Sequence, residues 1–166
     1  NGFRLVREGA LLYNPENPRL YWDLAIMYRQ KIVSYFDPAA SFYRVRLASE
    51  MAEILPDGRT TADDSRAGEL RERHGLDMGV MRELDERFGR LDWRLPETHA
   101  IYWAWMARQR SGADFVLQCD RLIYQSLGDL FRNGNLDFDS ANGRYITKPE
   151  FGLLNKVLSV YEADLE

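Results

Sequence analysis

Few residues in this sequence have the types and spacing that chemistry at a protein site requires. The chain contains two histidines, His74 and His99, and one cysteine, Cys119. A zinc site needs about four nitrogen or sulfur ligands, and no HExxH or paired-cysteine spacing supplies them. The GxSxG, Walker and GxGxxG motifs are also absent. The sequence therefore predicts no catalytic residue, no metal site and no cofactor.

The individual candidates have simpler interpretations. We expect His99 to be a helix residue with satisfied hydrogen bonds, and Cys119, on an apolar stripe, to be a buried thiol rather than a nucleophile. The segment LDWRLPE, residues 91–97, is interpreted as a turn capped by Asp92 and anchored by a buried Trp93. An enzyme would need the side chains of Asp92, Glu97 and His99 to converge in one pocket, a hypothesis that the spacing does not favour.

The segment DFDSANGRYITKPEF resembles a calcium-binding loop only faintly. Such a loop needs a glycine at its sixth position and a glutamate at its twelfth. Counted from Asp137, these positions hold Asn142 and Lys148. Asn142 and Gly143, between two alternating stretches, instead predict a small β-hairpin.

Composition and charge exclude some classes of protein. The chain has 166 residues, of which 45% are apolar, and a formal net charge of −4. This charge argues against a nucleic-acid-binding protein, which usually has a basic face. No apolar stretch approaches the roughly 20 residues that cross a bilayer. The first residue is Asn1 rather than methionine, so we expect a fragment or a processed form, and the sequence assigns no compartment.

Apolar residues at steps of three and four predict helices along most of the chain. The expected helices cover residues 3–13, about 20–35, 42–55, 70–88 with a break near Gly75, 96–110, 114–132 and 151–165. The helix over 42–55 should bury a stripe that includes Phe42, Val45, Met51 and Leu55. Prolines mark the corners, since proline breaks a helix but suits its first turn.

Two parts of the chain are similar to each other. LAIMYRQK, Leu24 to Lys31, matches WAWMARQR, Trp103 to Arg110, at an offset of 79 residues. RLASEM, Arg46 to Met51, matches SLGDLF, Ser126 to Phe131, at an offset of 80. Twice about 40 residues is a common spacing in helical-repeat proteins.

The first copy resembles a tetratricopeptide repeat. The family pattern of an aromatic, Leu, a small residue and Tyr is matched by Tyr21, Leu24, Ala25 and Tyr28, and its second-helix pattern by Ala39 and Tyr43. In the later copy Trp103 and Ala104 keep two of these positions, but Ala100 and Ala107 replace the tyrosines. The chain is also similar to uncharacterised bacterial proteins described only as tetratricopeptide-like. The resemblance implies an all-α, right-handed stack of antiparallel helical hairpins.

We therefore expect one helical-repeat domain over 1–166. Its parts would be the end of a preceding repeat (3–13), a first repeat (18–55), a degenerate middle unit (57–92), a second repeat (96–132) and a hairpin with a capping helix (136–166). The small residues Ala25 and Ala104 should lie where paired helices touch.

In the resembled family, the first helix of each repeat lines a concave groove that binds a partner. The corresponding residues here are Arg19, Trp22, Ile26, Arg29, Gln30, Thr98, Ile101, Trp105, Arg108 and Gln109. Arginine can bind a carboxylate through two parallel hydrogen bonds, and tryptophan offers a flat apolar surface. The alternative is that both tryptophans belong to the core and that the arginines are solvated.

The leading hypothesis is a non-enzymatic protein-interaction or assembly module that binds a peptide or a neighbouring subunit through this groove. The alternative is a structural accessory subunit of a larger complex, including one at a membrane. For the first hypothesis, an uncovered apolar side on the segment over 3–13 would imply a missing neighbour, because an array cut from its neighbours has exposed ends. For the second, size-exclusion of the isolated chain discriminates, and a monomer that binds nothing in a pull-down would weaken it.

Overall fold

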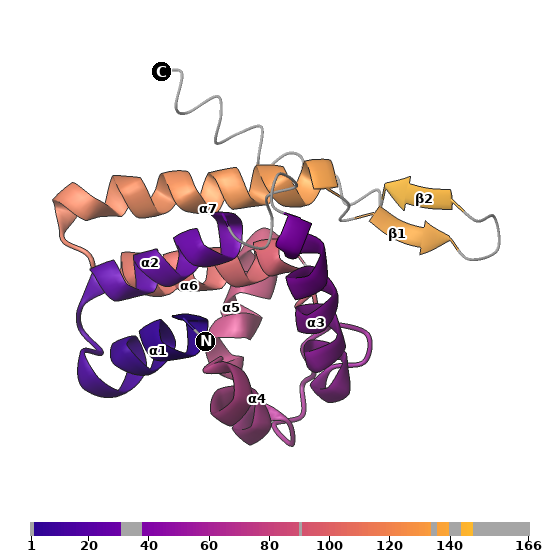
Figure 1. The fold of residues 1–166 in the computed structure, drawn as a ribbon, viewed down its shortest axis with the longest axis horizontal. Helices are drawn as coiled ribbons and strands as arrows, with labels where there is room; N and C mark the ends of the chain where they lie inside the picture. Colours follow the sequence, from indigo (N-terminus) through magenta and orange to yellow (C-terminus); the bar gives the residue numbers. More distant parts are fainter. Residues whose placement is uncertain (1, 31–37, 90, 134–135, 140–143, 148–166) are drawn as a thin grey trace.

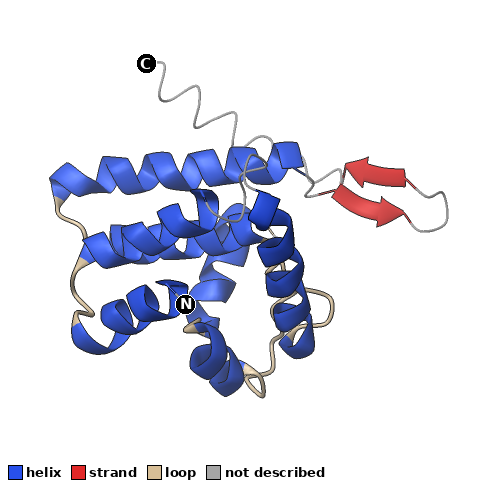
Figure 2. Ribbon diagram, viewed as in Figure 1, coloured by secondary structure: helices blue, strands red, loops and turns tan. Residues whose placement is uncertain are grey.

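The computed structural model describes residues 2–30, 38–89, 91–133, 136–139 and 144–147 (Figure 1). Helices account for most of this part of the chain (Figure 2). The predicted all-α class is therefore confirmed. The expected turn at Asn142-Gly143 and the expected helix over 151–165 lie outside the described residues, as does most of the segment compared with a calcium loop.

The helices follow the predicted order closely. They are α1 (Gly2–Glu8), which continues as a π-helical turn, η1 (Gly9–Tyr13), then α2 (Pro18–Tyr28), α3 (Pro38–Ile54), α4 (Ala67–His74), α5 (Met78–Phe88), α6 (Pro96–Arg110) and α7 (Ala113–Asn133). Two short strands, β1 (Leu136–Asp139) and β2 (Arg144–Thr147), pair antiparallel with Leu136 opposite Thr147.

Local sequence signals explain where these helices begin and end. The Asn17 side chain accepts a hydrogen bond of 3.0 Å from the Arg19 amide and caps α2, whose first residue is Pro18. Gly75 ends α4 with a φ of +71°, a conformation that glycine adopts without strain. Asp77 then caps α5, and the predicted break near Gly75 is confirmed.

The centre of the fold is α6, which α2 and α7 flank. Ring contacts between Tyr21 and Trp103, 6.1 Å between centroids, and between Tyr28 and His99, 5.2 Å, show that α2 runs antiparallel to α6. The ion pair between Arg108 and Asp120 joins α6 to the early part of α7. In Figure 1, α7 lies on one side of the α2–α6 pair and α1 on the other.

The helices α2 and α6, which carry the first pair of similar segments, therefore pack on each other. Ala25 and Ala104 are both fully buried, as expected for residues at helix contacts. However, the face of α2 that carries Ala25 lies on α6, whereas the expected hairpin would have paired α2 with α3. These contacts do not confirm a stack of repeats. In such a stack the middle unit over 57–92 would separate α2 from α6, and the two helices would not be adjacent.

The antiparallel pairing also accounts for the two alanines that depart from the family pattern. Tyr21 contacts the ring of Trp103 and the guanidinium of Arg110, so its side chain spans the stretch of α6 that contains Ala107. Tyr28 stacks on His99, next to Ala100. Small residues on α6 leave room for the tyrosines of α2, and the two helices fit closely.

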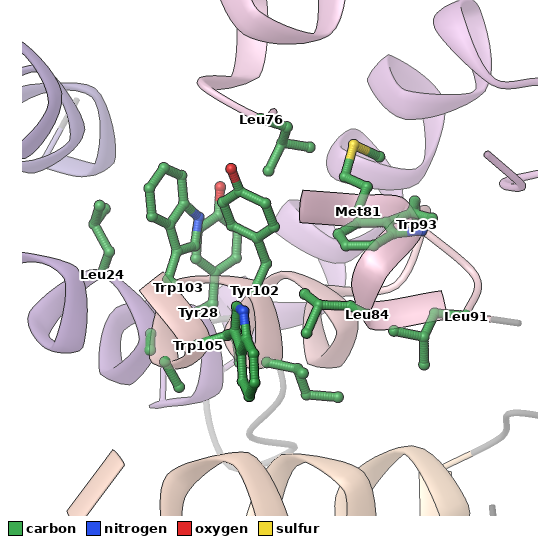
Figure 3. Close-up of a cluster of buried hydrophobic side chains, with 14 of the residues drawn as sticks. Leu24, Tyr28, Leu76, Met81, Leu84, Leu91, Trp93, Tyr102, Trp103 and Trp105 are labelled. Carbon is green, nitrogen blue, oxygen red and sulfur yellow. The ribbon is translucent and has the colours of Figure 1, made fainter. Parts of the chain in front are cut away.

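Large aromatic side chains fill the core beside α6 (Figure 3). Trp93, Tyr102 and Trp103 are completely buried. Tyr102 lies edge-on to both tryptophans, with centroid distances of 6.0 and 5.0 Å. Such edge-to-face pairs add to the stabilisation that burial provides.

The corner before α6 is built as predicted. The Asp92 carboxylate accepts hydrogen bonds from the Arg94 amide, at 3.0 Å, and from the Arg94 guanidinium. The Trp93 amide donates to the Gly58 carbonyl at 2.8 Å, which ties the corner to the loop after α3. The prediction of an Asp92-capped turn with Trp93 as a buried anchor is confirmed.

The prediction for α3 is only partly correct. Met51 and Leu55 are buried as expected, and Leu47 and Ile54 join them. Phe42 and Val45, assigned to the same buried stripe, are instead exposed. The first half of α3 thus presents apolar side chains to its surroundings.

Candidate functional site

Two of the groove residues predicted on α2 and just after it, Trp22 and Arg29, contact α7 rather than line an open groove. The Trp22 ring contacts Phe115 of α7, with 6.0 Å between centroids. Arg29 forms an ion pair of 2.8 Å with Asp129. Ile26 is partly buried, Arg19 lies over the Trp22 ring, and Gln30 is exposed.

On α6 the same prediction fails for a clearer reason. Ile101 and Trp105 are buried in the core, as is Thr98, so none of them offers its side chain to a partner in this fold. Arg108 pairs with Asp120 at 2.6 Å, and Gln109 is exposed. The predicted residues therefore do not share one accessible surface, because α6 is covered on several sides at once.

The side chains that could most readily take part in catalysis or metal binding, those of His99 and Cys119, have structural roles. The His99 Nε2–H donates to the Trp93 carbonyl at 2.8 Å, while its Nδ1 has no hydrogen-bond partner among the described residues. Burial lowers the pKa of His99 to about 3. Cys119 is buried as predicted, and burial raises the pKa of its thiol. No cluster of three or more His, Cys, Asp or Glu side chains suited to a metal ion occurs in the described ranges.

A different surface, on the N-terminal helical segment, has the properties of a binding site. One side of α1 and η1 is packed: the Phe3 ring lies 4.9 Å from that of Tyr28, and Ala10 is fully buried. The other side exposes 70% of Leu5, 70% of Leu12 and 78% of Tyr13. We call these three residues the α1 outer face. Large apolar side chains grouped in this way are typical of interaction surfaces.

A pocket of about 530 Å³ adjoins the α1 outer face at Leu12. Its apolar lining comes from Leu11 and Leu12 on η1 and from Tyr102 and Met106 on α6. Charged side chains of both signs complete the lining: Arg7, Glu8, Arg71, Glu72 and Asp77. An apolar floor with a polar rim is the usual composition of a binding pocket.

Gly75 determines how closely the N-terminal segment approaches this pocket. A Cβ atom at Gly75 would lie 2.8 Å from both Arg7 Cδ and Leu11 Cδ1. Only glycine thus allows η1 and α4 to meet at this distance. The sequence indicated Gly75 as a helix break, but nothing in its pattern showed which segment it would meet.

Hydrogen bonds hold the far wall of the pocket in place. The Tyr102 hydroxyl accepts from the Asp77 amide at 2.9 Å, and Asp77 also pairs with Arg71. Burial raises the pKa of Tyr102, so its hydroxyl stays protonated. This wall is therefore fixed by the core, whereas Leu12 is supported on one side only.

Known proteins provide no guide to the use of this surface. The chain matches no family model, no curated protein and no solved structure. Within the described residues, no helix is both long and apolar enough to cross a bilayer.

Proposed function

We propose that this chain is a non-enzymatic protein-interaction module, and that the α1 outer face and its adjoining pocket bind an apolar segment of a partner protein. The observation that carries the proposal is the exposure of Leu5, Leu12 and Tyr13 on a segment whose opposite side is packed. Exposed apolar groups gain roughly 25 cal/mol per Å² when a partner covers them.

The pocket favours a protein as the occupant. Leu11, Leu12 and Met106 suit an apolar side chain, and the surrounding charges of both signs suit the polar backbone and side chains that flank it. Leu5 lies on α1, and Leu12 lies on the π-helical turn η1 that continues it. A partner helix lying along α1 would contact both leucines and insert one side chain into the pocket.

Photo-crosslinking in the native host tests this proposal. A benzoylphenylalanine at position 12 should give one discrete adduct with another protein. The matched control is position 117: Leu117 is 68% exposed, but it lies on α7, on the opposite side of the α2–α6 pair (Figure 1). Adducts of the same kind from both positions, or none from position 12, would rule the proposal out.

A structural accessory subunit is the second candidate, favoured by the exposed Phe42 and Val45 on α3. A permanent subunit would cover α3 as well as α1, because obligate interfaces are large and apolar. Crosslinkers at positions 12 and 42 would then capture the same partner in stable stoichiometry. A transient module predicts capture at position 12 alone.

A further inference from the structure

A second pocket lies on the other side of Arg7, between α1, α3 and α4. Its volume is about 290 Å³, the size of a site for a small ligand. Its lining includes four arginines, Arg4, Arg7, Arg46 and Arg73, but a single carboxylate, Glu50. The wall of the pocket therefore carries more cationic than anionic side chains.

Three of the four arginines already have carboxylate partners. Arg4 pairs with Glu8 at 2.7 Å, and Arg46 with Glu50 at 2.9 Å. Arg73 pairs with both Glu53 and Glu69. Arg7 differs from these, because it forms no ion pair with any residue in the described part of the chain.

The position of Arg7 is nevertheless well defined. Its side chain is partly buried, and its Cδ and Cγ atoms lie against Gly75. The packed stem restricts the guanidinium to the space between the two pockets. A held guanidinium loses less freedom when it binds an anion than a solvated one does.

The imidazole of His74 is a second polar group at this pocket that lacks a partner for one of its nitrogen atoms among the described residues. It is buried on the α4 side of the same pocket, and its Nε2 atom has no hydrogen-bond partner among the described residues. Buried polar atoms are almost always hydrogen-bonded, so an unmatched one needs an explanation. An oxyanion would supply the acceptor that the described residues do not.

We infer that the pocket between α1, α3 and α4 binds a compact oxyanion, a phosphate or a carboxylate group, with the Arg7 guanidinium as its principal partner and His74 as the second. Arginine binds both groups through two parallel hydrogen bonds. The charges of Arg4, Arg46 and Arg73 are balanced by their own carboxylates, so the net positive charge that favours an anion comes from Arg7. Arg7 also lines the pocket beside Leu12, so the two proposed sites share this residue but otherwise have different linings.

Titration of the intact chain with inorganic phosphate and, separately, with acetate tests the inference. Calorimetry or amide NMR shifts should show saturable binding of at least one of the two, with the largest shifts at His74 and Leu47. Tighter binding of phosphate identifies a phosphorylated ligand, and tighter binding of acetate an acidic side chain. Sodium chloride at equal ionic strength controls for screening.

Variants assign the binding to Arg7. Arg7→Gln should weaken the anion roughly 10-fold or more, because a charge-assisted hydrogen-bond pair is lost. Arg121→Gln makes the same charge change on the exposed surface of α7 and should alter the affinity less than twofold. Equal effects of the two variants would overturn the inference.

The stem of Arg7 also contacts Gly75, so the fold of the Arg7→Gln variant must be checked by a thermal melt. If this variant does not fold, Arg7→Lys replaces it, because it keeps the stem and the charge but loses the planar fork. It should bind more weakly than the wild-type chain. A wild-type chain that saturates with neither anion overturns the inference without any variant.

Discussion

At the scale of single residues, the small side chains of α2 and α6 determine how closely the two central helices approach. Ala25 and Ala104 are fully buried, as the family pattern led us to expect, but Ala25 lies against α6 rather than against the expected hairpin partner α3. Leu24 and Tyr28, on the apolar stripe at steps of three and four, are buried, as is Tyr21, which the family pattern added. Periodicity could identify this face because a helix repeats its buried positions every three or four residues.

Substitution of either alanine by leucine should destabilise the protein. Ala25→Leu and Ala104→Leu each add three carbons to a closed contact, which we expect to cost about 1–3 kcal/mol of unfolding free energy. Urea denaturation measures the change. Ala113→Leu, at the exposed start of α7, is the matched control and should stay within about 0.5 kcal/mol of the wild-type chain. Urea denaturation curves unchanged in both core variants would mean that these helices do not meet.

The two histidines make stability depend on pH. Burial is the main cause that lowers the pKa of His74 to about 4 and of His99 to about 3. An unfolded chain has a histidine pKa near 6.5, so below that pH it takes up protons that the folded chain does not. The unfolding free energy should therefore fall as the pH drops from about 6.5 towards 4.

Urea denaturation at pH 7, 6, 5 and 4.5 checks this dependence. His99→Gln removes one titrating group while keeping an amide that can donate to the Trp93 carbonyl. Its unfolding free energy should fall less steeply over this range than that of the wild-type chain. Parallel curves for the two proteins would show that His99 is not buried in its neutral form.

At the scale of the elements, the bounds of the helices were predictable but their partners were not. Pro18, Gly75 and Pro96 mark helix ends through their backbone preferences, which act locally. Which helix covers a given apolar face depends on the whole chain. The resemblance to a repeat paired α2 with α3, whereas α2 packs mainly on α6.

The burial of Ile101 and Trp105, wrongly assigned to a groove, could have been predicted from the sequence. Ala100 to Ala107 is an uninterrupted run of eight apolar residues. A helix that is apolar all round is buried on all sides rather than on one. This run predicts the burial of Ile101 and Trp105 better than the family geometry does.

The contact between η1 and α4 is testable through one pair of glycines. Gly75→Ala should lower the unfolding free energy by about 1–3 kcal/mol, because alanine is strained at a φ of +71° and its Cβ would meet Arg7 and Leu11. Gly68→Ala, inside α4 with no atom near its Cβ position, should stabilise by about 0.5–1 kcal/mol. The same urea denaturation measures both, and an equal response would show that Gly75 is not in close contact.

At the scale of the whole molecule, the N-terminal segment connects the core to both proposed sites. Arg7 lines both pockets, Leu12 lies on the α1 outer face, and Phe3 attaches the segment to the core at Tyr28. The composition and patterning predicted an all-α chain. They could not predict these sites, because each site forms between segments that are distant in the sequence.

The central claim is that α1, α2 and α6 form one packed unit. Aromatic NOE spectroscopy on the wild-type chain tests it most directly, through the ring of Tyr28. That ring lies 4.9 Å from the Phe3 ring and 5.2 Å from the His99 ring, measured between centroids. We predict cross-peaks from the Tyr28 ring to both of the other rings. A folded chain in which the Tyr28 ring shows neither cross-peak would contradict the account.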